Sequence, residues 1–171
     1  MLNKPGGCVS AVTDRDCRTV LDLIGDKNRK DLFPVGRLDK DTEGLLLITN
    51  DGMLSHNLLA PGKHISKTYY ARVSGEVTQE DAAVFAGGID IGEKRDTLPA
   101  ELKVLSCEGG VSEIELTITE GKFHQVKRMF AGVGKEVVYL KRISMGGLKL
   151  DDELKPGEYR RLTEKEISKI M

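Results

Sequence analysis

Short runs in which apolar and polar residues alternate are the feature that most restricts the fold of this chain. Residues 67–73 alternate strictly, so that Tyr69 and Val73 point to one side of a strand and Tyr70 to the other. Residues 114–118 repeat the pattern. Strands of this kind belong to antiparallel sheets that have one face on a core and one face in water. The sequence therefore predicts a sheet built largely from antiparallel strands.

A few short helices are expected between these strands. Thr78 and Asp81 have the spacing of a capping box, which predicts a helix that ends at the following glycine pair. Residues 123–133 place apolar side chains at helical spacing, and residues 19–24 fit a short helix capped by Thr19. The expected fold class is α+β, with a mixed, mostly antiparallel sheet and flanking short helices.

Length and composition place the chain among ordinary globular proteins. Its 171 residues suit one domain, or one domain with two lobes, and the hydrophobic and charged fractions are 39% and 31%. No apolar run approaches the roughly 18 residues that span a bilayer. The N-terminal residues lack the layout of a signal peptide. We therefore expect a cytoplasmic protein with no membrane partner.

Metal and cofactor chemistry have little support in the sequence. The three cysteines and three histidines show no paired metal-ligand spacing, and an odd number of cysteines argues against a disulfide framework. Neither a GxxxxGK[ST] loop nor a GxGxxG turn is present. We expect no metal and no cofactor.

Charge is distributed unevenly although the formal net charge is only −1. Residues 120–149 contain seven Lys or Arg and two Asp or Glu, whereas residues 76–101 contain two and seven. The basic segment could attract phosphates, although two solvated faces would explain the same pattern.

The densest motif of polar and apolar residues covers positions 36–52. It places Asp39 in a polar turn just before a strongly apolar strand, residues 45–49, with Arg37 two positions away. A carboxylate held in this way could reach a cleft as a nucleophile or a base. An ordinary turn-capping aspartate is the alternative.

Three ordered motifs resemble those of the RsuA-type ribosomal small-subunit pseudouridine synthase family. The first is Gly-Arg-Leu-Asp at 36–39 followed by Thr-Glu-Gly-Leu-Leu at 42–46, the second is Lys-Thr-Tyr at 67–69, and the third spans residues 120–130. The segments 2–6 and 156–160 also match, so the resemblance covers nearly the whole chain. The family usually begins with an S4-type RNA-binding domain, which is absent before the matched region here.

The resemblance implies the pseudouridine synthase fold, with a catalytic cleft between two lobes, and one catalytic domain over residues 1–171. It also implies an isomerase, an intramolecular transferase, that converts uridine to pseudouridine without a cofactor. Asp39 would attack ribose C1′ or remove a C2′ proton, and the sequence leaves both routes open. Tyr69 would stack on the target base, unless it is simply a half-buried strand tyrosine. Lys127 would pair with Asp39 and keep it ionised.

Further basic residues are candidates for substrate binding. They are Arg37, Lys67, His124, Arg128 and Arg142. Phe123-His124 stands where many large-subunit relatives carry Asn-Arg, so the resemblance favours 16S ribosomal RNA, as RNA or in a ribosome assembly intermediate. A monomer is the default expectation, because the sequence carries no sign of the oligomeric state. The same reaction on 23S ribosomal RNA and a non-catalytic RNA-binding module remain alternatives.

Overall fold

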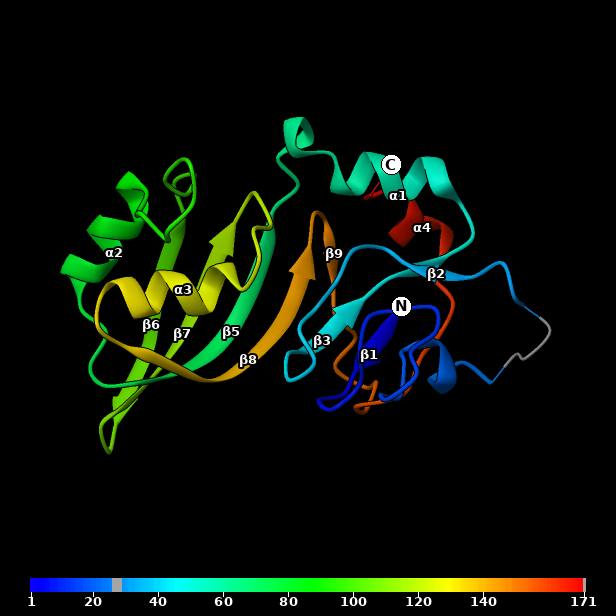
Figure 1. Ribbon diagram of the computed structural model, residues 1–171, viewed down its shortest axis with the longest axis horizontal. Helices are drawn as coiled ribbons and strands as arrows, with labels where there is room; N and C mark the ends of the chain where they lie inside the picture. The colour runs from blue at the N-terminus through cyan, green and yellow to red at the C-terminus, as the bar shows by residue number, and fades with distance from the viewer. Residues whose placement is uncertain (26–28, 171) are drawn as a thin grey trace. The chain divides into compact units, whose positions relative to one another are not determined.

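The computed structural model describes residues 1–25 and 29–170, which fall into two compact units. Unit 1 comprises Met1–Ile65 and Arg142–Met171, and unit 2 comprises Ser66–Lys141. Short helices accompany strands that pair mostly in antiparallel fashion (Figure 1). The predicted α+β class is therefore confirmed.

Unit 1 is built on short strands, two of which, β3 (Glu43–Leu46) and β4 (Ile48–Thr49), lie within the 36–52 motif. Strand β1 (Leu2–Lys4) pairs with β3, and β2 (Phe33–Pro34) pairs with β4. The other elements are η1 (Leu21–Leu23), α1 (Gly52–Leu59), η2 (Pro61–Lys63), β9 (Leu148–Lys149) and α4 (Glu164–Ile167). Asp51 caps α1 by accepting hydrogen bonds from two backbone N–H groups, and Leu58 buries the helix against the apolar core.

Unit 2 is a curled sheet with helices against it. Strand β7 (Val111–Ile118) pairs with both β5 (Lys67–Ser74) and β6 (Glu101–Glu108). Figure 1 shows α3 (Gln125–Gly132) crossing in front of these strands and α2 (Gln79–Gly87) beside them. Phe85 of α2 and Phe130 of α3 meet edge to face at 5.1 Å between ring centroids. This aromatic pair joins the two helices in the core.

Strand β8 (Glu136–Met145) contributes to both units, because the boundary between them falls at residue 142. Its last residues pair with β9 within unit 1. The chain therefore returns from unit 2 to unit 1 within strand β8.

Two helix predictions need correction. Residues 19–24 form only the single 3-10 turn η1, because Thr19 and Asp22 close a local turn through reciprocal hydrogen bonds and Ile24 is already extended. Helix α3 begins at Gln125 rather than at residue 123, because His124 has a left-handed backbone with φ of 49°. The capping box of α2 is present as predicted, and α4 has a second one, formed by Thr163 and Glu166.

None of the helices in the described part of the chain is long and apolar enough to cross a membrane. Within residues 1–25 and 29–170, no group of three or more His, Cys, Asp or Glu side chains is arranged to hold a metal ion.

Candidate active site

Asp39 lies in a turn of unit 1 that is held on its N-terminal side. The Ser10 hydroxyl donates to the Leu38 carbonyl at 2.9 Å and accepts from the Leu38 N–H at 3.0 Å. Leu38 is buried, whereas Asp39 is half-buried and Arg37 is exposed. The turn closes where the Thr42 N–H donates to the Asp39 carbonyl at 3.1 Å. The candidate carboxylate is thus placed on a fixed backbone and stays partly accessible.

Lys4 supports the same turn from inside the protein. Its side chain is fully buried, and its ammonium donates to the carbonyls of Pro5, Lys40 and Thr42 at 3.1, 3.2 and 2.8 Å. Burial lowers the pKa of Lys4, and nearby negative groups, Asp39 among them, oppose that shift. A buried ammonium whose donors are all used in this way fixes the path of the turn.

Gly36 explains why the motif opens with a glycine. Its backbone has a φ of +74°, and a Cβ at this position would lie 2.8 Å from a methyl group of Leu59. Only glycine combines the left-handed backbone with this close approach to α1. The turn that carries Asp39 is therefore tied to the packing of that helix.

Arg142 lies in unit 1, where it supports strand β3 within the motif. It is 3% exposed, and its Nε donates to the Leu45 carbonyl at 2.9 Å. Its Nη2 is buried without a hydrogen-bond partner. Because the guanidinium is enclosed, the geometry favours a role in holding β3, and direct binding of substrate stays a prediction for this residue.

Tyr69 and Lys67 lie on β5 of unit 2 and face the same side of the sheet. Tyr69 is 8% exposed and Lys67 is 9% exposed, and they stand opposite Leu116 and Ile118 of β7. Tyr70 points to the other side, where its ring meets that of Tyr139 edge to face. The predicted alternation of β5 is confirmed.

The first turn of α3 carries the remaining candidates in unit 2. Lys127 is half-buried, and His124 precedes the helix as its N-cap without a side-chain capping bond. Their spacing of three and four residues would place His124, Lys127 and Arg128 on one face of a helix that began at residue 123. His124 departs from this, because its backbone is not helical.

Arg128 has several partners within unit 2. Its Nη1 donates to Glu93 at 2.7 Å and to the Phe123 carbonyl at 3.0 Å, and its Nη2 donates to the Ile91 carbonyl. These bonds join the start of α3 to the loop that precedes β6. A supporting role is thus visible for Arg128, whereas phosphate binding stays a prediction.

The structure thus groups the candidates in two sets. Unit 1 contains Arg37 and Asp39 in one turn and Arg142 bonded to strand β3, whereas unit 2 contains Lys67 and Tyr69 on β5 and the candidates at the start of α3. Sequence reasoning missed Lys4 and Ser10 as supports. The match of residues 2–6 to the family was the only signal that pointed to Lys4, and it did not indicate what this residue does.

Comparison with known proteins identifies the class to which this fold and site belong. The sequence model described as RNA pseudouridylate synthase matches residues 1–132. A Bacillus subtilis protein described as an uncharacterized RNA pseudouridine synthase is 51% identical over 98% of this chain and 70% of its own length. The ribosomal small subunit pseudouridine synthase A of Escherichia coli is 45% identical over 100% of this chain and 73% of its own length.

Solved structures agree with this class. A crystal structure of a pseudouridylate synthase superimposes with a TM-score of 0.93 at 43% identity, covering 99% of this chain and 72% of that one. An archaeal box H/ACA Nop10–Cbf5 complex contains a chain with the same fold, with a TM-score of 0.61 at 21% identity, over 91% of this chain and 50% of that one. The fold and motifs are those of RNA-modifying isomerases. The chain belongs to the RNA pseudouridylate synthase family.

Proposed function

We propose that this pseudouridine synthase isomerises a uridine of 16S ribosomal RNA in the small subunit. The name of the E. coli relative supports this substrate, since that protein is aligned with the whole of this chain at 45% identity. Phe123-His124 in the third motif supports it too. The enzyme would act as a cytoplasmic monomer on ribosomal RNA or an assembly intermediate, with residues 1–171 as one catalytic domain.

We propose Asp39 as the catalytic carboxylate. The observation that carries this assignment is the turn held on both sides, by Ser10 at Leu38 and by the buried Lys4 at Lys40 and Thr42. A catalytic group needs a fixed position, and a backbone anchored by these bonds supplies it. The carboxylate would act either as a nucleophile at ribose C1′ or as a base at C2′.

Tyr69 and Lys127 complete the proposed catalytic set. The ring of Tyr69 would stack on the uracil while it is detached, turned and rejoined through carbon. Lys127 would provide the positive charge that the reaction needs beside a carboxylate. Five residues are proposed to bind the RNA: Arg37, Lys67, His124, Arg128 and Arg142. Two of them have a supporting role as well, because Arg128 holds the start of α3 and Arg142 holds strand β3.

The reaction is tested by release of tritium from 16S ribosomal RNA that carries 5-tritiated uridine. The wild-type enzyme should release tritium, and Asp39→Asn should lower the rate by about 10²-fold or more, because the amide can be neither nucleophile nor base. Retention of the activity in a folded Asp39→Asn variant would contradict the assignment.

The choice of substrate is tested separately by mapping pseudouridines in cells with and without the gene. Loss of one modification from 16S ribosomal RNA is expected, while loss from 23S ribosomal RNA would move the substrate to the large subunit. RNA binding by the wild-type protein without turnover on either RNA would favour the non-catalytic binding module.

A further inference from the structure

Phe123 presents an aromatic ring to solvent at the start of the third motif. The residue is 68% exposed, the largest value for any Phe or Tyr in the described part of the chain. Single exposed apolar side chains are common and usually need no explanation. This ring differs from them because it is part of a stack and because its backbone is held by several bonds.

The stack is formed with the neighbouring imidazole. The rings of Phe123 and His124 lie nearly parallel, with centroids 3.8 Å apart and planes at 20°. His124 has a left-handed backbone, with φ of 49°, which costs about 1 kcal/mol or more in a residue other than glycine. The imidazole covers one face of the phenyl ring, and Phe123 remains mostly exposed to solvent.

The backbone on both sides of this pair is fixed. The Phe123 carbonyl accepts from Arg128 at 3.0 Å, and the His124 carbonyl accepts from the Arg128 N–H at 3.0 Å. On the other side, the Lys122 N–H donates to Gln125 at 2.9 Å, and the Lys122 ammonium donates to the carbonyls of Arg95 and Asp96 at 2.8 Å each. An exposed ring held so firmly loses little conformational entropy when it binds a flat partner.

We propose that Phe123, backed by His124, is a stacking surface for a nucleobase of the RNA near the uridine that is isomerised. The inference rests on the proposed action on RNA. A nucleobase suits the ring because every base has a π face, and stacking on an aromatic side chain is the usual way in which proteins hold unpaired bases. Lys127, a residue proposed to serve the chemistry, lies in the first turn of α3, four positions after Phe123 in the chain.

Binding and turnover of 16S ribosomal RNA transcript labelled with 5-tritiated uridine test this proposal. Phe123→Ala should raise Kd and KM about tenfold, within a range of about 5- to 150-fold, because one base stack is lost. The value of kcat should stay within about twofold, since binding of a neighbouring base is the same in the ground and transition states. Phe123→Leu should lose nearly as much, whereas Phe123→Tyr should stay close to wild type.

Val84→Ala is the matched control, because Val84 is an exposed apolar residue on α2 of the same unit. It should leave Kd, KM and kcat unchanged. Thermal unfolding of all variants tests whether a change of Kd comes from loss of the fold. We expect Tm values close to that of wild type, because the Phe123 side chain is mostly outside the core.

Three outcomes would overturn the proposal. One is wild-type Kd in both Phe123→Ala and Phe123→Leu, and another is full affinity in Phe123→Leu alone, which would require apolar packing and no stacking. The third is a concentration-dependent dimer that Phe123→Ala disrupts, which would make a second copy the partner of the ring. If wild type binds the transcript but releases no tritium, the proposed function fails while the Kd series still decides on Phe123.

Discussion

Lys4 and Gly36 show how single residues determine the position of Asp39. One supplies a buried ammonium that gathers three backbone carbonyls, and the other permits a backbone and a close contact that no other residue allows. Neither touches the proposed chemistry directly. Both act on the turn that carries it.

Lys4→Met should remove this support and weaken both stability and catalysis. The buried Thr42 carbonyl would lose the donor at 2.8 Å, which costs about 1–3 kcal/mol. The carbonyls of Pro5 and Lys40 would each lose one bond but still accept from Cys8 and from the Gly7 N–H. We expect the free energy of unfolding to fall by at least about 2 kcal/mol in urea titrations, and kcat to fall more than KM rises. Lys30→Met, at an exposed position of the same unit, is the control and should change neither quantity.

Gly36→Ala should destabilise unit 1. The added Cβ requires a strained backbone at φ +74° and overlaps a methyl group of Leu59, which together cost about 2–4 kcal/mol. Gly62→Ala is the control, because nothing lies within 4 Å of its added Cβ. Equal midpoints of chemical denaturation for the two variants would contradict the strain at Gly36.

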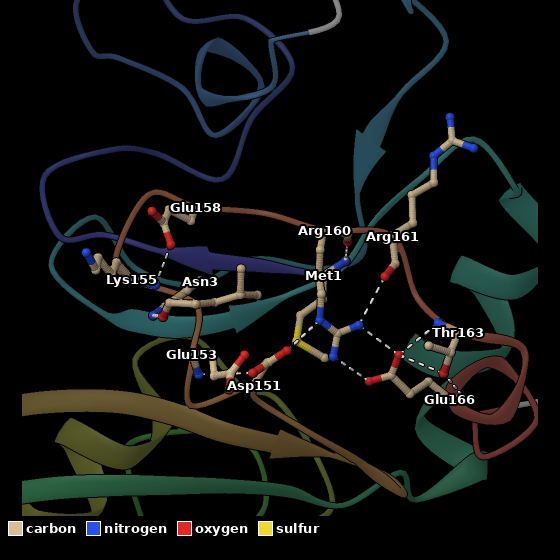
Figure 2. A network of polar contacts seen from close by, with 11 residues as sticks. Met1, Asn3, Asp151, Glu153, Lys155, Glu158, Arg160, Arg161, Thr163 and Glu166 are labelled. Carbon is tan, nitrogen blue, oxygen red and sulfur yellow. Dashed lines mark hydrogen bonds and ion pairs between the residues drawn. The ribbon is translucent and has the colours of Figure 1, made fainter.

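At the scale of elements, helix α4 is too short to be stable by itself and is held by neighbouring groups. It has four residues, and Thr163 with Glu166 forms its capping box. Figure 2 shows Arg160 between the carboxylates of Asp151 and Glu166, with contacts of 2.5 and 2.7 Å. This group of three residues ties the C-terminal helix to the loop after β9.

The stability supplied by Glu166 should depend on pH. The hydrogen bonds from Arg160, followed by that from the Thr163 N–H, lower the pKa of Glu166 to about 2, below its unfolded value of about 4.3. Its contribution is therefore complete above about pH 4.3 and is lost as the pH falls toward 2. Glu166→Gln should lower Tm by a few degrees at pH 7, and the difference from wild type should narrow between pH 5 and pH 3.

Glu164→Gln removes a charge from the same helix and provides the control. Its Tm difference from wild type should be smaller at pH 7. A Glu166→Gln difference that stays constant down to pH 3 would show that the carboxylate is not what stabilises α4.

For the whole molecule, the charge of the basic segment is largely used inside the protein. Lys122, Arg128 and Lys135 contact Glu120, Glu93 and Asp81 respectively, and Arg142 is buried. The sequence suggested a broad phosphate-binding surface over residues 120–149. These pairings leave fewer cations available for RNA than the sum of charges implied.

The salt dependence of RNA binding should distinguish cations that contact RNA from cations that are paired inside the protein. Arg37 is exposed, so Arg37→Gln should reduce the slope of log K against log salt by about 0.7 to 1, the share of one phosphate contact. Lys135→Gln should lower stability and leave the slope unchanged, because Lys135 is paired with Asp81 at 2.9 Å. A similar change of slope in both variants would contradict the internal use of the basic segment.

The sequence by itself determined the features that depend on short-range spacing. Alternation in β5 and both capping boxes are local patterns, and each is present in the structure. The three family motifs are local patterns too, and they lie within the residues that the family model matches. Local spacing failed where a short turn competed with a helix at residues 19–24, and it gave no sign of the left-handed residue before α3.

Only the tertiary structure decided which polar side chains support the site and which of them remain available for RNA. Lys4 reaches carbonyls 36 and 38 positions away, Ser10 reaches Leu38 over 28 positions, and Arg142 reaches Leu45 over 97. Contacts between such distant positions follow from chain topology and from the need to satisfy every buried polar group. Neither can be predicted from the spacing of residues that are close in the sequence.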